Sequence, residues 1–144
     1  MQYQTVLSDV AAVETRAAIV APLIAYNEEH AGPSDHRPLV IRIEDESGQV
    51  VGGLWGYTRG GWLYTELLSA PAGARGQGWG RRMMEQAEAE ARARGCIAAW
   101  VDTHSFQAPK FYESLGYQRF GELEDYPPGH SRIFYRKCLR EGSP

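Results

Sequence analysis

Three glycines at alternating positions, Gly76, Gly78 and Gly80, come directly before a helical run that starts with Arg81 and Arg82. Glycine has no Cβ, so the backbone can approach a ligand closely and adopt a positive φ without strain. The first turn of a helix carries unpaired N–H groups at the positive end of its dipole, and such a helix start binds anions. We interpret the stretch as a phosphate-binding loop; the alternative is a glycine-rich helix start without function.

Spacing separates this loop from two common phosphate-binding motifs. The P-loop pattern needs a Lys and a hydroxyl residue after its last glycine, and neither follows here. The dinucleotide fingerprint needs its third glycine one residue later than Gly80. The residues instead spell R-x-x-G-x-G from Arg75 to Gly80. That pattern resembles the acetyl-CoA pyrophosphate loop of the GCN5-related N-acetyltransferase (GNAT) family.

A second motif supports the same resemblance. The stretch Ala108-Pro109-Lys110-Phe111-Tyr112-Glu113-Ser114-Leu115-Gly116-Tyr117 is similar to the family's A-x-x-[LF]-Y-x-x-x-G-[FY] signature. It follows the glycine loop after one predicted helix and one predicted strand, in the order that the family's topology requires. Two motifs in the right order are more specific than either alone. The resemblance extends from Leu39 to Leu139.

The resemblance implies a path for the acyl donor, acetyl-CoA. Arg75 would add charge at the rim of the loop. The pyrophosphate would be held by the backbone amides of Gly76, Gln77, Gly78, Trp79, Gly80 and Arg81. The pantetheine arm would pair with the backbone of Leu68, Ser69 and Ala70 like an added strand, with an amide near Leu68 directed at the thioester oxygen. Such a hydrogen-bond donor typically contributes ~10²-fold or more in rate.

The resemblance also places Tyr112 near the thioester sulfur. A phenol with a reference pKa of about 10 stays protonated at neutral pH and can donate its proton to the departing thiolate. The alternative is a buried aromatic side chain beside Phe111. The chain departs from the family at Ser105, where many relatives carry an Asn that helps to hold the cofactor. A hydroxyl is shorter and offers a single donor, which puts that contact in doubt.

The general base stays open between two candidates. Glu66 lies on the strand that leads to the glycine loop, and a partly apolar pocket would raise the pKa of its carboxyl toward neutrality. Strand parity could instead direct it to solvent. His104, with Asp102 close by, is the second candidate, and a solvated loop histidine is the alternative. His130 follows the acidic loop and could also reach the acceptor.

The elements that position these residues follow from periodicity and turn signals. We expect a strand over 2–7, a helix capped at Ser8–Asp9 with a break near Ile19–Pro22, and three antiparallel strands over 38–44, 49–58 and 62–69. A helix over 75–94 then buries Met83 and Met84 and ends at Gly95, and its exposed face carries the ion pairs Glu88–Arg92 and Glu90–Arg94. The last expected elements are a strand over 96–101, a helix over 106–115 capped by Ser105, a strand from Tyr117, an acidic loop over 122–129 and a strand over 131–139.

These elements predict an α/β fold in which the helix over 75–94 connects a parallel pair of strands. The resemblance implies a mixed, mostly antiparallel sheet of six or seven strands, flanked by helices. It also implies a V-shaped splay between the two strands that bracket this helix. A length of 144 residues favours a single domain over 1–144.

Composition limits the classes of function. A net charge of −3 disfavours nucleic-acid binding, and the scattered histidines disfavour a metal site. Cys96 and Cys138 indicate reduced thiols of a cytoplasmic protein. No apolar run reaches membrane-spanning length, so we expect no membrane partner.

The acceptor is the least constrained feature. Glu122, Glu124 and Asp125 with Tyr126 suit a cationic amine if their loop folds over the site, or they form a solvated acidic loop. Trp55, Tyr57 and Trp62 line an acceptor pocket or belong to the core. The sequence thus predicts an acetyl-CoA-dependent N-acetyltransferase acting on a small primary amine. A silent acyl-CoA sensor and a protein acetyltransferase are the alternatives. If Ile133-Phe134-Tyr135 lies at a sheet edge, a homodimer is plausible.

Overall fold

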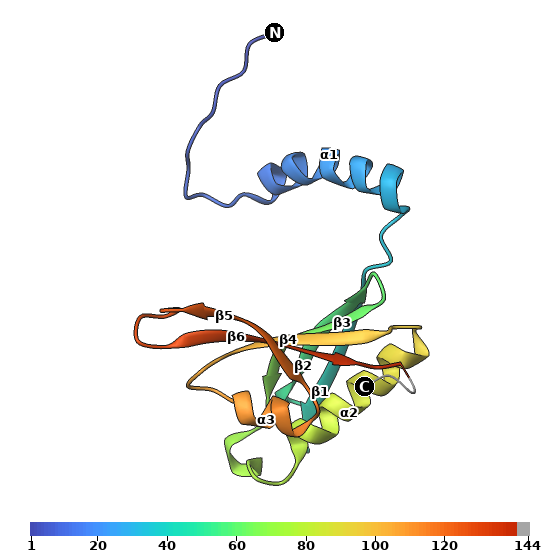
Figure 1. Cartoon of the computed structure of the whole chain (residues 1–144), viewed down its shortest axis with the longest axis vertical. Coiled ribbons are helices and arrows are strands. Elements are labelled where there is room, and N and C mark those ends of the chain that lie inside the picture. The colour runs from blue at the N-terminus through green and yellow to red at the C-terminus, as the bar shows by residue number, and fades with distance from the viewer. Residues whose placement is uncertain (141–144) are drawn as a thin grey trace. The chain divides into compact units, whose positions relative to one another are not determined.

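The computed structural model of the chain describes residues 1–140, which divide into two compact units. The first unit, Met1–Ser34, contains a segment without regular secondary structure and helix α1 (Val13–Ala31). The second unit begins at Asp35 and contains the sheet and the other helices (Figure 1). The expected single-domain organisation stays a prediction.

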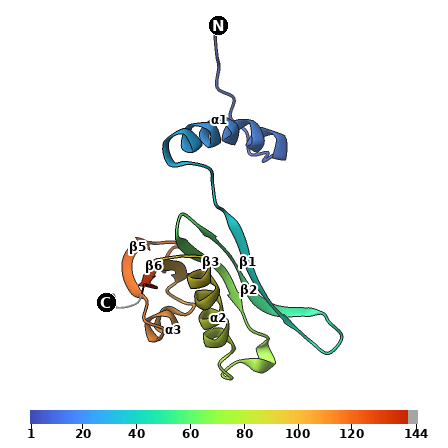
Figure 2. The ribbon, with the colours of Figure 1, turned by 90° about the vertical axis from the view of Figure 1, so that its right-hand side faces the viewer.

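A six-stranded sheet organises the second unit, with the strand order β1-β2-β3-β4-β6-β5 (Figures 1 and 2). Its strands are β1 (Arg37–Glu44), β2 (Val50–Arg59), β3 (Trp62–Ser69), β4 (Ala98–His104), β5 (Gln118–Glu124) and β6 (Ser131–Cys138). Only β3 and β4 are parallel; all other neighbours are antiparallel. A parallel pair needs a crossover, which helix α2 (Trp79–Ala93) provides. The predicted mixed, mostly antiparallel sheet is confirmed.

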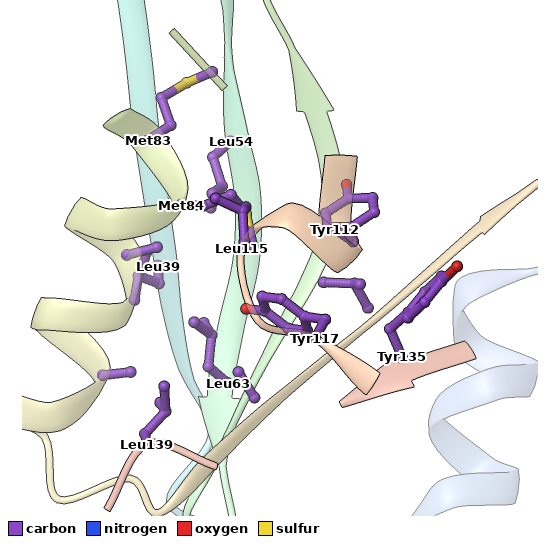
Figure 3. Packing of buried hydrophobic residues seen from close by; sticks show 14 of the residues in the cluster. Leu39, Leu54, Leu63, Met83, Met84, Tyr112, Leu115, Tyr117, Tyr135 and Leu139 are labelled. Atoms are coloured by element: carbon purple, nitrogen blue, oxygen red, sulfur yellow. The ribbon is translucent and has the colours of Figure 1, made fainter. Parts of the chain in front are cut away.

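The core lies between one face of this sheet and the helices α2 and α3 (Pro109–Ser114). Met83, Met84, Ala87 and Ala91 recur at helical spacing along α2 and are at most 2% exposed. They pack in one cluster with residues of the sheet and of α3, among them Leu39, Leu54, Leu63 and Tyr112 (Figure 3). The prediction that both methionines face the core is confirmed.

Glu88 contradicts the expected solvent-exposed face of α2, because it is only 3% exposed. Its carboxylate accepts hydrogen bonds from the Tyr117 hydroxyl at 2.9 Å and from Lys137 Nζ at 2.7 Å. Figure 3 shows the Tyr117 hydroxyl directed toward α2. A buried carboxylate is tolerated when a cation and a hydroxyl replace its water. The expected Glu90–Arg94 pair is present at 2.8 Å.

The first unit differs from the sequence prediction in three ways. Residues 2–7 form no strand, because alternation gives a strand only where another strand accepts its hydrogen bonds, and the sheet uses residues 37–138. Helix α1 begins at Val13 after Ala12; the Ser8 hydroxyl instead accepts a bond from the amide of Val10, at 3.0 Å. The helix continues through Pro22 without the expected break. Proline removes one backbone donor, which a longer helix tolerates at a cost.

Several boundaries in the second unit also differ. Helix α2 begins at Trp79 rather than residue 75, after a short 3₁₀ turn (Ala72–Ala74). The strand expected over 96–101 is β4 and extends to His104. The helix expected over 106–115 is the shorter α3, because Pro109 fixes its first turn. Gly95 follows α2 with a φ of 84°, as expected for a residue that ends a helix.

The last two strands correct two expectations. Strand β5 runs through Glu124, so Glu122 and Glu124 lie on a strand and only the residues after them form the loop. Strand β6, which carries Ile133, Phe134 and Tyr135, lies between β4 and β5, so it is not an edge. The edge strands are β1 and β5. The expected route to a homodimer through β6 is therefore wrong.

Cys96 is a buried, free thiol, and the Cys138 Sγ donates to the carbonyl oxygen of Ile97 at 3.8 Å. Within residues 1–140, no helix is long and apolar enough to cross a membrane.

Candidate active site

Strands β3 and β4 pair at one end and part at the other. Their parallel register runs from Trp62 opposite Ala98 to Thr65 opposite Val101 and stops there. Beyond this point β3 pairs only with β2, and β4 pairs only with β6. Glu66–Ser69 of β3 and Asp102–His104 of β4 do not pair with each other. We call these two stretches the strand divergence. Backbone groups of β3 that face β4 there are free to pair with an extended ligand.

The start of α2 has the properties of an anion site. Gly78 precedes the helix with φ 80° and ψ 14°, no side chain caps the first turn, and no acidic residue lies in it. The first helical hydrogen bond runs from the amide of Arg82 to the carbonyl of Gly78, at 3.0 Å. The preceding amides of the first turn are therefore left without a helical acceptor. Because nothing lies within 4 Å of a Cβ placed on Gly76 or Gly78, the loop is open to a ligand such as a pyrophosphate.

Gly80 has a different reason to be glycine. A Cβ at this position would lie 3.0 Å from the Phe111 ring, so Gly80 lets α3 pack closely against α2. Arg81 supports the same contact, because its Nη2 donates to the carbonyl of Ser114 at 3.4 Å and to its hydroxyl at 3.3 Å. The side chain of Arg81 thus links α2 to the end of α3.

Tyr112 is positioned by α3 at the edge of the core. It is 7% exposed, and its ring meets the rings of Phe111 and Tyr117 edge to face. Its hydroxyl points away from Leu63 and Tyr117 (Figure 3). Burial, and next the negative charge of Asp102, raise the pKa of Tyr112 to about 12. The phenol is therefore held in its protonated, proton-donating form.

His104 ends strand β4 and is half-buried. Its ring stacks on Phe106, with centroids 5.2 Å apart and an interplanar angle of 11°. Its Nδ1 lies 3.1 Å from the carbonyl oxygen of Tyr126. A carbonyl only accepts, so Nδ1 carries a proton, and in the neutral form of the ring the lone pair is on Nε2. That tautomer suits a general base.

Glu66 is an exposed residue at a β-bulge. The register of β2 with β3 passes from Trp55 opposite Leu67 to Gly56 opposite Thr65, which leaves Glu66 without a partner. A bulge bends a strand and redirects a side chain. The exposed Glu66 carboxylate thus lies at the first residue of the strand divergence.

A polar cluster that the sequence analysis did not assign lies beside these residues. The Asp102 carboxylate accepts a hydrogen bond from the Tyr64 hydroxyl at 2.9 Å and pairs with Arg132 Nη2 at 2.8 Å. The Tyr64 ring stacks on Trp100 with centroids 4.0 Å apart. Burial and then the bond to Asp102 raise the pKa of Tyr64, so the phenol stays protonated. The alternation of Trp100, Asp102 and His104 along β4 was the available signal, since the three share one face.

The other predicted site residues occupy separate places. The Ser105 hydroxyl accepts a bond from the amide of Ser131 at 2.9 Å and does not cap α3, whose N-cap is Ala108. Leu68 and Ser69 end β3, and Ala70 follows it.

Exposed Trp55 and half-buried Tyr57 and Trp62 do not belong to the core cluster. His130 contacts Phe106 edge to face at 4.9 Å, so it lies beside the His104 ring stack.

Comparisons with known proteins agree with this geometry. The sequence profile described as the Acetyltransferase (GNAT) family matches residues 9–117. The chain belongs to the GNAT family.

Three relatives illustrate the likeness. The acetyltransferase Atu2258 of Agrobacterium fabrum is 44% identical over 92% of this chain and 96% of its own. Blasticidin-S acetyltransferase of Streptomyces morookaense is 48% identical over 58% of this chain and 62% of its own. A crystal structure of an Agrobacterium tumefaciens protein assigned to the acetyltransferases superposes with a TM-score of 0.91. It is 43% identical, covering 94% of this chain and 99% of the other. The GNAT fold is confirmed, and the protein is an acyltransferase.

Proposed function

We propose that this GNAT protein transfers an acetyl group from acetyl-CoA to a primary amine of a small molecule. The observation that carries the proposal is the conjunction of an uncapped, acid-free start of α2 with the strand divergence and the buried, protonated Tyr112. An anion site, a free strand edge and a proton donor are what a pyrophosphate, a pantetheine arm and a leaving thiolate require.

The residues of the chain would act together in a direct transfer. The loop before α2 would hold the pyrophosphate, and the free edge of β3 at Leu68–Ala70 would orient the arm. The acceptor nitrogen attacks the thioester carbon, so that a C–N bond forms and the C–S bond breaks. The nitrogen loses one proton to Glu66 or to His104 Nε2, and Tyr112 gives one proton to the departing sulfur. Both substrates are then bound at once.

The acceptor side supports a cationic or planar amine. Two aromatic pairs lie along β4: Trp100 stacks on Tyr64, and His104 at the end of the strand stacks on Tyr126. Asp102 is neutralised by Arg132, so Glu66 and the carboxylates of β5 are the candidates to attract a protonated amine. The blasticidin-S acetyltransferase, by its name, acts on a small molecule, in keeping with this class of acceptor.

A panel of amines tests the proposal by the release of free CoA thiol. Polyamines, aminoglycosides and nucleoside antibiotics form one arm, and peptides with free lysine or N-terminal amines form the other. Turnover in the first arm is expected. Turnover only with peptides would make the protein a protein acetyltransferase. Binding of CoA without turnover of any amine would leave an acyl-CoA sensor.

We further propose where the protein is located and what it binds. The protein is cytoplasmic, it uses neither metal nor nucleic acid, and it forms a homodimer. Its homodimer would use surfaces other than β6. Support comes from exposed apolar side chains of the sheet, since Val40, Trp55 and Leu67 are 43%, 55% and 59% exposed.

A further inference from the structure

Three threonine side chains are buried in the sheet: Thr58, Thr65 and Thr103. The Thr58 hydroxyl accepts a hydrogen bond from Arg94 Nη1 at 3.1 Å. The Thr103 hydroxyl donates to Gln107 Oε1 at 3.2 Å and accepts from the amide of Ala108 at 3.4 Å. Thr65 is 3% exposed, and its Oγ1 is the one buried side-chain polar atom in residues 1–140 without any partner.

The position of this hydroxyl indicates a contact with a ligand. A buried hydroxyl without a hydrogen bond destabilises a fold, so a natural chain rarely keeps one without a use. Thr65 is the last residue of β3 that pairs with β4, and the bulged Glu66 follows it. Its side chain lies on the same face as Leu63, two residues earlier, which is the face that α2 and α3 cover. The unpaired hydroxyl therefore lies at the origin of the strand divergence, on the Tyr112 side.

We propose that Thr65 binds the acyl donor by donating its hydroxyl proton to a carbonyl oxygen of the donor's arm. This inference rests on the proposed function. The arm carries amide and thioester carbonyls, and each is an acceptor that a threonine hydroxyl can satisfy. A ligand strand that continues the sheet between β3 and β4 must begin next to Thr65, because the pairing of the protein strands ends there. Binding of the donor thus supplies the hydrogen-bond partner that the Thr65 hydroxyl lacks within the protein.

Calorimetric titration with CoA and with acetyl-CoA tests the contact. Thr65→Val keeps the branched shape and removes the hydroxyl, so the Kd for acetyl-CoA is expected to rise about 3- to 10-fold. Thr65→Ser keeps the hydroxyl and is expected to stay within about twofold of the unmodified protein. A loss with both ligands points to a pantetheine amide, and a loss with acetyl-CoA alone points to the thioester; either result supports the proposal.

Thermal unfolding without ligand separates binding from folding. The Tm of Thr65→Val should be equal to or above that of the unmodified protein, because the change removes an unpaired polar atom from the interior. The matched control is Thr58→Val, which deprives Arg94 of an acceptor and should lower the Tm while the Kd is unchanged. Equal affinity of Thr65→Val and the unmodified protein for both ligands would overturn the contact. If the unmodified protein binds no CoA, the proposed function itself fails.

Discussion

Tyr112 is the residue with the clearest chemical assignment. Its ring is fixed by aromatic contacts, its hydroxyl is directed away from Leu63 and Tyr117, and burial raises the pKa to about 12. A free thiol has a pKa of about 8.5, so full transfer from such a phenol to a thiolate would be uphill at equilibrium by roughly 5 kcal/mol. We therefore expect Tyr112 to stabilise the departing sulfur by a hydrogen bond whose proton moves late.

Replacement of the phenol tests this role. Tyr112→Phe should lower kcat by roughly 10²-fold with little change in KM, because the proton donor acts in the transition state. Steady-state kinetics on the best amine from the panel would measure it. Tyr117→Phe is the matched control: it loses the bond to Glu88 and about 1 kcal/mol of stability, and keeps its kcat. An unchanged kcat in Tyr112→Phe would remove the acid from the mechanism.

The pH profile gives a second test at this scale. A raised pKa keeps the Tyr112 proton bound in the folded protein as pH rises, so the donor is lost only near pH 12. Activity should rise as the acceptor amine and the base lose their protons, and then stay level to about pH 10. Tyr112→Phe should lower the plateau without moving the rise. A fall of activity near pH 8 that disappears in this variant would contradict the assignment.

Glu66 and His104 remain alternatives for the base. If Glu66 accepts the proton, Glu66→Gln should lower kcat/KM by about 10²-fold at neutral pH, and His104→Ala should not. The reverse result would assign the role to His104. If neither change lowers kcat/KM, substrate amines lose their protons without these groups.

Residue types in the sequence indicated some members of the candidate site and missed others. Gly78 and Tyr112 were accessible because their motifs are local and their chemistry depends on the backbone or on a single side chain. The Asp102–Tyr64–Arg132 cluster could not be predicted from the sequence, since its members come from three strands that only the sheet order brings together. The predicted exposure of Glu88 was wrong for the same reason, because its partners Tyr117 and Lys137 are distant in sequence.

At the scale of elements, α2 contributes both to the candidate site and to the hydrophobic core. Its first turn faces the predicted donor, while Glu88 fastens its middle to β6 through Lys137. Glu88→Gln should lower the free energy of unfolding by about 2 kcal/mol, because Lys137 loses its buried counter-ion. Urea denaturation would measure the loss. The matched control is Glu90→Gln on the exposed side of α2, which should leave the midpoint nearly unchanged. Equal midpoints for both variants would contradict the role of the buried pair.

The loop before α2 offers a comparison between two glycines. Gly78 has a φ of 80°, so Gly78→Ala strains the backbone and should displace the loop, raising the Kd for CoA about tenfold. Gly73 has no positive φ and open space around it, so Gly73→Ala should bind CoA normally. Calorimetric titration compares them. A normal Kd in Gly78→Ala would show that the loop conformation does not govern donor binding.

Elements of the sheet were predictable where the pattern is local. The alternation over residues 37–69 gave β1, β2 and β3 within two residues, and the apolar run after α2 gave β4. The alternation over residues 2–7 misled, because only a neighbouring strand turns such a pattern into structure. Sheet order was not available from the pattern, and so the position of β6 between β4 and β5 could not be predicted.

At the scale of the whole molecule, exposed apolar surface is the basis of the homodimer proposal. Val40, Trp55 and Leu67 lie on three neighbouring strands and are exposed. Light scattering after size exclusion should give about twice the chain mass of 16.1 kDa. Trp55→Glu should shift the distribution to the monomer, because it charges the apolar surface. A monomeric mass for the unmodified protein would contradict the proposal.

The central claim is that an acyl-CoA binds along the strand divergence, with its pyrophosphate at the start of α2. Hydrogen exchange measured by mass spectrometry with and without CoA tests the location directly. Protection should appear in peptides covering residues 66–70 and 76–82, because their free amides gain acceptors. Protection confined to other segments, or none at saturating CoA, would contradict the account.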